Sequence, residues 1–423
     1  MNEFKKGVEV RLIIHNILFA IKYKNFNFDY IFEKVKKRED LKTSDYNLIN
    51  DVVLSSMRLH LYVNKIINLY TKKKPKKDQY ILLLSSITQL VYLNYQNYAV
   101  INCAVEIAKL DKIIAVPGFI NSVLKNIDQN KSELKKIVLE EKQLSQITNY
   151  FLFDKIDRNK KIEIFESIAQ KPHTHLVFKK KINNNKQIIK ITNFSGILKN
   201  KISINSLDEF KNGDCWVQDF GAMLPLYLTK KLKNLNVLDM CAAPGGKTFQ
   251  LINSGAKVHS IEKEHLRGLK LKENLNRLKF NSNIKIIDVL KLKEDKKFNL
   301  VVLDAPCSSI GTIRRNPDIL FKNKKVNINQ MYKNQINLLE KANRLLLVNG
   351  TLIYIVCSFV NHETYKPIMD FLKKNKNFSI ERFNSEKKYS SLIDSNGFIK
   401  IFPQKFSGTF IDGFFAAKLK KNA

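Results

Sequence analysis

The sequence predicts a multidomain protein: an all-α N-terminal domain, a small α+β middle domain and a C-terminal α/β domain of Rossmann-like type. Up to about residue 130, apolar residues recur three and four positions apart, as in helices. Short β-like runs follow, and beyond residue 230 apolar strands alternate with amphipathic helices. This alternation favours a doubly wound parallel sheet. We expect domains over residues 1–135, 136–225 and 226–423.

The N-terminal domain is expected to be helical throughout. Helical spacing of apolar residues is clearest over residues 80–93, which read YILLLSSITQLVYL, and over 102–110, which read NCAVEIAKL. Pro117 and Gly118 are placed to end one helix before the next begins. No catalytic pattern occurs in this part, so its expected role is packing and the presentation of a basic face.

The middle domain is expected to be small and mixed. Residues 131–150 form a charged stretch that predicts a helix or a linker. Beyond it, THLVFKKK and KQIIKITNF have the character of short strands. The last domain contains the strand-like runs LNVLDM, KVHSIE, IKIID, FNLVVLDA and GTLIYIVC, separated by helical stretches such as HLRGLKLKENLNRLK and NQINLLEKANRLLL.

Charge and cysteine content narrow the class of protein. Lys and Arg number 73 against 39 Asp and Glu, so the net charge is 73 − 39 = +34, which favours a nucleic-acid partner. The alternative is an AT-rich genome, which raises Lys, Asn and Ile together. The five cysteines form no CxxC pair and no metal-ligand spacing, so we expect reduced thiols and no metal. The N-terminal stretch indicates an amphipathic helix rather than a signal peptide, and we expect a soluble, cytoplasmic protein without a membrane span.

A strand, a small-residue turn and a helix start follow one another in NVLDMCAAPGGKTFQL, residues 236–251. Gly245 and Gly246 let a ligand approach the backbone closely, and the helix N-terminus offers free N–H groups. A phosphate-binding loop is a rival interpretation because GGKT resembles its end. That motif needs a glycine where this chain has Cys241, and GxGxxG is also absent. A tight turn without a ligand is the remaining alternative.

Acidic residues at three strand ends sharpen this choice. Glu262 is placed to accept both hydroxyls of a ribose, Asp288 to accept from an adenine amino group, and Asp239 lies beside the glycine turn. A ribose, an adenine and a cationic amino acid moiety together describe S-adenosylmethionine better than a phosphate-rich nucleotide. Each acid taken singly is also consistent with a helix N-cap.

Two further strand-like runs each deliver a Cys-Ser dipeptide to a loop. Cys307 follows Asp-Ala-Pro in VVLDAPCSSIGTIRRNPD, and Cys357 ends GTLIYIVC. A single buried cysteine is more often a small hydrophobic residue than a reactive one. Two such loops beside Asp304 instead indicate paired thiol chemistry.

Four of these motifs resemble the Sun family of RNA cytosine-5 methyltransferases: DMCAAPGGKT, DAPCSSIGTIRRNPD, VCSFVNHET and DGFFAAKL. The stretch NCAVEIAKL…VPGFINSVLKNI is similar to the NusB-like domain of the bacterial 16S ribosomal RNA branch. The resemblance covers most of the chain and is weakest between about 140 and 210. The chain departs from the family in having Val356 where Thr is usual, DAPCSSIG in place of DAPCSGTG, and no Arg-Asn at LVFKKK.

The resemblance implies a NusB-like RNA-binding domain, a middle RNA-binding domain and an S-adenosylmethionine-dependent methyltransferase domain. It implies that Cys357 attacks cytosine C6 and that Cys307 assists release of the methylated base. Asp304 would hydrogen-bond the N3 edge, and Lys247 would lie near both cofactor and target base. The residues expected to bind S-adenosylmethionine are Asp239, Cys241, Ala242, Ala243, Pro244, Gly245, Gly246, Lys247, Glu262, Asp288 and Asp304.

The expected substrate is 16S ribosomal RNA, unassembled or partly assembled, methylated by a monomeric enzyme. Arg314 and Arg315 would clamp phosphate or stack on a base, and a surface salt bridge is the alternative for either. The target base has to leave its stack, so a single-stranded or loop substrate is expected. Transfer RNA is one alternative substrate, and a non-catalytic NusB-like RNA-binding factor is the other interpretation. Glu363 matches a family acid, and the sequence assigns it no role.

Overall fold

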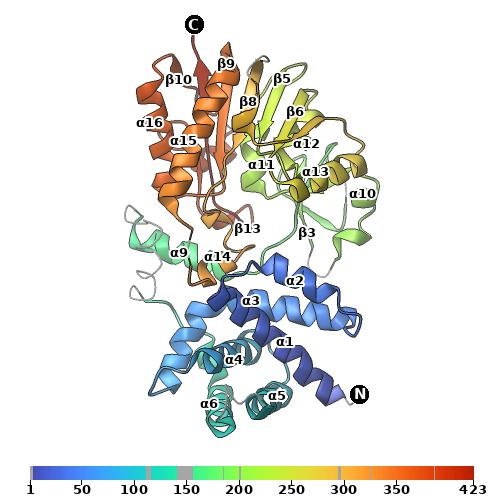
Figure 1. Cartoon of the computed structure of the whole chain (residues 1–423), viewed down its shortest axis with the longest axis vertical. Helices are drawn as coiled ribbons and strands as arrows, with labels where there is room; N and C mark the ends of the chain where they lie inside the picture. Colours follow the sequence, from blue (N-terminus) through green and yellow to red (C-terminus); the bar gives the residue numbers. More distant parts are fainter. Residues whose placement is uncertain are drawn as a thin grey trace. The chain divides into compact units, whose positions relative to one another are not determined.

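Figure 1 shows the computed structural model of the chain. It describes residues 3–110, 116–140, 156–183, 185–199, 202–293, 297–324, 326–384 and 386–423. The chain divides into two compact units. We call the first the helical unit, made of described residues within 1–150, 156–171 and 313–326. We call the second the sheet unit, made of those within 172–312 and 327–423.

The helical unit surrounds one apolar core that includes Ile14, Leu18, Ile49, Leu84 and Leu124, all fully buried. The helix expectations for the two N-terminal runs are confirmed, and α6 begins at the proline expected to break the chain. Of the charged stretch after residue 130, only the part up to residue 140 lies within the described residues. The helices are α1 (Glu3–Lys24), α2 (Phe28–Lys36), α3 (Thr43–Tyr70), α4 (Lys77–Ile87), the π-helical turn η1 (Thr88–Tyr92), α5 (Asn97–Leu110), α6 (Pro117–Gln129), α7 (Lys131–Leu134), α9 (Arg158–Ala169) and α14 (Asp318–Phe321).

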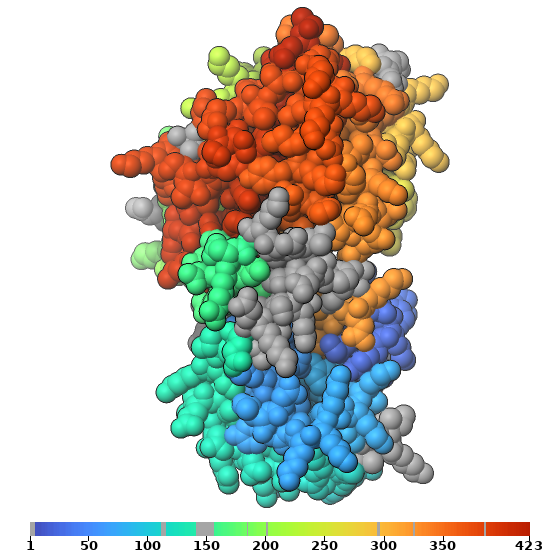
Figure 2. Space-filling view, turned by 90° about the vertical axis from the view of Figure 1, so that its left-hand side faces the viewer, coloured from blue at the N-terminus to red at the C-terminus, as the bar shows by residue number. Residues whose placement is uncertain are grey.

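Helix α14 joins the helical unit although it follows the Cys307 loop in sequence. Phe321 is fully buried in the helical core, and the Lys22 ammonium lies 4.5 Å from the centre of its ring. Lys22 Nζ also donates to the Phe321 carbonyl at 3.3 Å, and Arg58 Nε donates to the Arg314 carbonyl at 2.7 Å. In Figures 1 and 2 this orange segment lies beside the blue helices. No pattern in residues 301–326 predicted that the chain would leave one unit for the other here.

The middle part of the chain forms a four-stranded antiparallel sheet in the order β2-β3-β1-β4. The two strand-like runs predicted there correspond to β1 and β2. Trp216 of β4 packs edge-on against Phe249, 5.9 Å between ring centres, so this small sheet shares a core with the larger one. The division at residue 225 therefore stays a proposal. The elements are β1 (His175–Phe178), β2 (Ile188–Lys190), β3 (Ser195–Leu198), η2 (Ile204–Ser206), α10 (Asp208–Lys211) and β4 (Cys215–Val217).

The large sheet has the order β10-β14-β9-β8-β5-β6-β7, with β11 paired to β14. Strands β9, β8, β5, β6 and β7 run parallel, as expected. The sheet is not wholly parallel, because β14 returns antiparallel along β9, with Phe415 opposite Val356. The elements are α11 (Phe220–Tyr227), β5 (Asn236–Met240), α12 (Gly246–Asn253), β6 (Lys257–Glu262), α13 (His265–Arg277), β7 (Asn283–Ile286), η3 (Val289–Lys291), β8 (Phe298–Asp304), η4 (Ile310–Thr312), α15 (Ile328–Leu345), β9 (Leu346–Val356), η5 (Asn361–Glu363), α16 (Tyr365–Lys374), β10 (Phe378–Ile380), η6 (Lys387–Leu392), β11 (Ile399–Ile401), β12 (Gln404–Phe406), β13 (Thr409–Ile411) and β14 (Phe414–Lys421).

Alternation along the strands places successive side chains in two different cores. Val237 and Val302 belong to the core that includes residues of α11, α12 and α13. Their neighbours Leu238 and Val301 belong to the core that includes residues of α15 and α16. Helices therefore cover both faces of the sheet, which explains the continuous apolar runs of its central strands.

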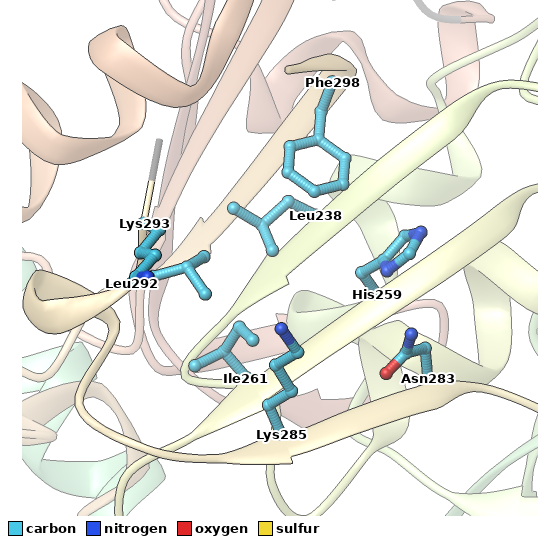
Figure 3. A pocket seen from close by; sticks show the side chains of 8 residues that line it. All are labelled: Leu238, His259, Ile261, Asn283, Lys285, Leu292, Lys293 and Phe298. Carbon is cyan, nitrogen blue, oxygen red and sulfur yellow. The ribbon is translucent and has the colours of Figure 1, made fainter. Parts of the chain in front are cut away.

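A small hollow lies on the sheet near the β7 edge (Figure 3). It measures about 60 Å³, and His259, Asn283 and Lys285 are its polar strand residues. None of the candidate site residues lines it. Among the described residues, no helix combines the length and apolar character needed to cross a membrane.

Candidate active site

The candidate site lies where the strand order of the large sheet reverses direction. From β5 the chain proceeds to β6 and β7 on one side, whereas β8 and β9 lie on the other. Ligands of such sheets bind outside the carboxyl ends of the strands at this reversal. The glycine turn follows β5, the Cys307 loop follows β8 and the Cys357 loop follows β9. Three motifs far apart in sequence therefore meet at one edge.

The two loop cysteines face each other at this edge. Their Sγ atoms are 3.3 Å apart, and both residues are half-buried. Cys357 Sγ also lies 3.4 Å from Ser309 Oγ. The backbone holds the loops together as well, because Gly311 N–H donates to the Cys357 carbonyl at 3.0 Å. The paired thiols expected from sequence are thus adjacent in space.

The pKa values of the two thiols are shifted in opposite directions. The hydrogen bond with Cys357, reinforced by burial, raises the pKa of Cys307 well above its ordinary value. The hydrogen bond from Cys307 lowers the pKa of Cys357, with help from Ser309 and the Lys247 charge and against burial and the Asp304 charge. These directions favour Cys357 as the thiol that ionises first, with Cys307 as the hydrogen-bond donor. Thiolate is the nucleophilic form of cysteine.

A lysine–aspartate ion pair lies beside the thiols. Lys247, in the first turn of α12, is buried and its Nζ lies 2.7 Å from Oδ2 of Asp304 at the end of β8. Burial tends to lower the pKa of Lys247, but the Asp304 charge and hydrogen bond outweigh it, and the net shift is upward. The lysine therefore stays charged beside the carboxylate.

The glycine turn leaves no room for side chains at its centre. Gly245 has φ of 117°, and a Cβ there would lie 2.1 Å from the Phe249 ring. A Cβ on Gly246 would lie 3.0 Å from Gln218. Cys241, at the start of the turn, has φ of 62°, and burial raises the pKa of its thiol to about 12, so it stays protonated. Glycine is required at the centre of this turn by both conformation and space.

Two of the three strand-end acids support the turn. Glu262 Oε2 accepts from Ala243 N–H at 3.1 Å, and Oε1 accepts from Glu264 N–H at 3.0 Å. Asp239 is fully buried, and its Oδ2 accepts from Thr248 Oγ1 at 2.5 Å. Its Oδ1 has no hydrogen-bond partner among the described residues, and burial raises the pKa of Asp239 to about 7. An unsatisfied buried oxygen beside the turn fits a ligand that brings a donor or a cation.

The third acid does not end its strand. Strand β7 stops at Ile286, and Asp288 instead caps η3, with Oδ1 accepting from Leu290 N–H at 3.0 Å. Its Oδ2 lies 3.1 Å from Lys263 Nζ. Burial raises the pKa of Asp288, but the hydrogen bonds from Leu290 and Lys263 and the nearby lysine charges together outweigh it, so the net shift of the pKa is downward. Asp288 is therefore an N-cap, the alternative that the sequence left open for each of these acids.

The remaining candidates differ in accessibility. Ala242 and Ala243 are buried in the turn, whereas Pro244 is exposed. Arg314 is fully buried within the helical unit, and Arg315 is half-buried. A buried guanidinium has no surface to offer to a phosphate, so among the two only Arg315 keeps the expected RNA contact as a proposal.

Glu363, to which the sequence assigned no role, makes several hydrogen bonds near the two cysteines. Glu363 in η5 is fully buried and accepts three hydrogen bonds, from Ser308 N–H at 2.6 Å, Ser308 Oγ at 2.5 Å and Ser358 Oγ at 2.6 Å. These serines directly follow the two cysteines in sequence. The only sequence signal was the acid itself, six residues beyond Cys357.

Comparison with known proteins finds two matching family models. Residues 226–420 match the model of a family described as 16S rRNA methyltransferase RsmB/F, and residues 8–129 match that of the NusB family. These two matches confirm the resemblance drawn from the motifs. The protein is therefore an RNA methyltransferase that depends on S-adenosylmethionine.

Individual relatives extend over most of the chain. It is 28% identical over 413 residues to ribosomal RNA small subunit methyltransferase B of Proteus mirabilis, with 91% of this chain and 92% of that protein covered. It is also 28% identical to the probable ribosomal RNA small subunit methyltransferase B of Coxiella burnetii, covering 77% and 82%. The solved structure of the protein PH0851 shares the fold, with a TM-score of 0.71 at 20% identity over 98% and 99% of the two chains.

Proposed function

We propose that this enzyme methylates C5 of a cytosine in 16S ribosomal RNA through a transient covalent bond between Cys357 and C6. One observation carries the proposal. The Sγ atoms of Cys357 and Cys307 lie 3.3 Å apart, at the same edge of the sheet as the Lys247–Asp304 ion pair. Cytosine C5 is a weak nucleophile until C6 is attacked, and this site combines a thiolate with a nearby proton donor.

The cofactor pocket is proposed at the glycine turn. When bound, S-adenosylmethionine supplies an electrophilic methyl group. Asp239 Oδ1 would accept from its amino group, and Glu262 has lone pairs left for the ribose hydroxyls. The turn residues from Cys241 to Lys247 would lie against the remainder, while Asp288 would need to share its oxygens with Lys263 to reach the adenine.

The first step forms a bond between the Cys357 sulfur and C6. Electron density moves toward N3, which takes a proton supplied by Lys247 through Asp304, and the ring becomes nucleophilic at C5. Such positioned acid catalysis typically contributes roughly a hundred- to ten-thousandfold in rate. C5 would then gain the methyl group as the bond between that methyl and the cofactor sulfur breaks, and the pair recovers its proton from N3 when the adduct breaks.

Breaking the adduct requires removal of the C5 proton. Cys307 is proposed to take it, because its raised pKa depends first on the hydrogen bond with Cys357. Once Cys357 is a thioether, that bond and charge are gone, so Cys307 loses its proton to solvent more readily and its thiolate can accept the C5 proton. The electron pair of the C5–H bond then re-forms the ring double bond, and Cys357 leaves as thiolate.

The substrate assignment has support from both parts of the chain. The NusB family matches residues 8–129, and the full-length relatives are named for the small ribosomal subunit. The formal charge of +34 favours any RNA, so charge alone does not separate ribosomal from transfer RNA. We propose unassembled or partly assembled 16S RNA, whose bases can leave their stacks. That the enzyme is monomeric and cytoplasmic stays a prediction.

The test is methyl transfer from labelled cofactor to naked 16S RNA and, in parallel, to transfer RNA. Bisulfite sequencing of the product should show one or a few protected cytosines in 16S RNA only. If protected cytosines appear in transfer RNA alone, the substrate is transfer RNA rather than 16S RNA. Absence of transfer to both RNAs would favour the non-catalytic RNA-binding interpretation.

A further inference from the structure

Glu363 connects the two catalytic loops without touching either sulfur. Its Oε1 accepts from Ser308 N–H, and its Oε2 accepts from the hydroxyls of Ser308 and Ser358 at 2.5 and 2.6 Å. Ser308 follows Cys307 and Ser358 follows Cys357 in the chain. One carboxylate therefore fixes the residue next to each thiol.

The surroundings hold this carboxylate firmly. Glu363 is fully buried, and the Tyr354 hydroxyl donates to its backbone carbonyl at 2.7 Å. The Cys307 loop has a second fixed point, since Gln335 Nε2 of α15 donates to the Pro306 carbonyl at 3.0 Å. A carboxyl group that accepts from three donors over 2.5–2.6 Å is best satisfied as the carboxylate.

The charge of this carboxylate acts unequally on the two sulfurs. It adds to the hydrogen bond, burial and Cys357 charge that raise the pKa of Cys307. The charges that act on Cys357 come instead from Asp304 and Lys247. Burial raises the pKa of Glu363 itself, while its serine donors work in the opposite direction.

We propose that Glu363 is a positioning residue that selects Cys357 as the nucleophile. It holds Cys307 beside Cys357 through the two serines, and its negative charge keeps the shared proton on Cys307. This inference rests on the proposed function, because it explains which of the two thiols attacks the base. Glu363 itself touches neither base nor cofactor.

Two substitutions separate the tether from the charge. Glu363→Gln keeps the volume and leaves an amide oxygen for Ser308 N–H, while the serine hydroxyls can turn to accept from its NH₂ group, so mainly the charge is lost. Glu363→Ala loses both. Glu381→Gln is the matched control, because Glu381 is a partly exposed acid of the same unit that pairs with Lys418.

The first measurement is alkylation of the RNA-free protein by iodoacetamide, with mass spectrometry to assign the modified cysteine. Wild type and Glu381→Gln should react at Cys357. In Glu363→Gln, Cys307 should gain at least about tenfold in relative reactivity, which corresponds to one pKa unit between the thiols. Unchanged selectivity for Cys357 would overturn the inference.

The second measurement is steady-state methylation. Glu363→Ala should lower kcat by about a hundredfold, the effect of displacing a reacting group by about 1 Å, while KM for the cofactor stays within about twofold. A fall in kcat matched by a loss of folded protein, with wild-type cysteine selectivity, would show a merely structural role and overturn the proposal. If Glu363→Ala does not fold, Ser358→Ala removes one tether and should show the same pattern at reduced size.

The alkylation result is independent of the methylation chemistry. If wild-type protein methylates no cytosine but Glu363→Gln still redirects alkylation to Cys307, the proposed function fails and the role of Glu363 stands. If wild type methylates cytosine and selectivity does not change, the function stands and this inference fails.

Discussion

The Cys307 and Cys357 loops have the same local design and opposite chemistry. Each cysteine is followed by serine, each loop follows a parallel strand of the same sheet, and both thiols are half-buried. Yet the pKa of Cys307 is raised and that of Cys357 is lowered, each chiefly through the hydrogen bond they share. What differs is the charged neighbours: the Glu363 charge raises the pKa of Cys307, whereas the Asp304 charge raises and the Lys247 charge lowers that of Cys357. The identity of a nucleophile is thus decided by neighbours that its own motif does not contain.

Removing each of the two cysteines in turn is the strongest test of this contrast. Cys357→Ala should lower methylation by at least about a thousandfold and leave no covalent RNA complex, because the attacking sulfur is gone. Cys307→Ala should instead accumulate a denaturation-resistant protein–RNA complex, since release is blocked after attack. Denaturing gels with labelled RNA measure both. A complex in Cys357→Ala and none in Cys307→Ala would reverse the assignment.

Asp304 offers a test in which two effects have opposite signs. Asp304→Asn should lower kcat by roughly a hundred- to ten-thousandfold, because protonation at N3 is impaired. The Asp304 charge raises the pKa of Cys357, so its removal should shift the alkylation midpoint of Cys357 to lower pH. Slower methylation with an upward shift would mean that Asp304 activates the thiol rather than the base. Iodoacetamide rates between pH 5 and pH 10 provide this measurement.

Gly311 tests whether the backbone must hold the two loops together. Its N–H donates to the Cys357 carbonyl and its carbonyl accepts from Gly413 N–H at 2.8 Å. A Cβ on Gly311 would lie 1.9 Å from the Gly413 oxygen, so Gly311→Ala should lower the free energy of unfolding by about 1–3 kcal/mol and reduce methylation further than stability explains.

Gly118→Ala is the control for that substitution, because Gly118 lies in helix α6 and a Cβ there meets nothing within 4 Å. It should leave the unfolding free energy unchanged or raise it by up to about 1 kcal/mol. Urea unfolding followed by fluorescence or circular dichroism would compare the two. Equal stability of both variants would show that the loops do not need this close approach.

Ser309 should have the smallest effect. Its hydrogen bond is one of the influences that lower the pKa of Cys357, so Ser309→Ala should shift the alkylation midpoint upward by less than the loss of Cys307 does. Methylation at pH 7 should fall only a few-fold, since a neutral hydrogen bond contributes about 1 kcal/mol. A larger shift than in Cys307→Ala would mean that Ser309, not Cys307, is the main donor to the thiolate.

Features set by local sequence were predictable. Continuous apolar runs that alternate with helical stretches located the strands that carry Asp304 and Cys357, and the glycine turn followed from its composition. Because parallel strands end at a common edge, the two cysteines could be expected to meet. Asp288 was misplaced, since β7 stops two residues earlier and the acid caps η3.

Features that depend on contacts between distant segments were not predictable. The bonds from Ser308 to Glu363 join residues 55 apart, and no spacing rule links them. The antiparallel return of β14 also escaped prediction, since its apolar run carries no direction. The burial of Phe321 in the helical core likewise depends on helices almost 300 residues earlier in the chain.

The passage of residues 313–326 through the helical unit limits how this gene can be divided. A fragment that starts at residue 172 would contain every described strand and both loop cysteines. It would also contain α14 without the helices that surround it, leaving Phe321 in water. A recombination event that replaced the N-terminal helices would have to supply helices that bury residues 313–326 in the same way. We therefore expect the two units to be inherited together.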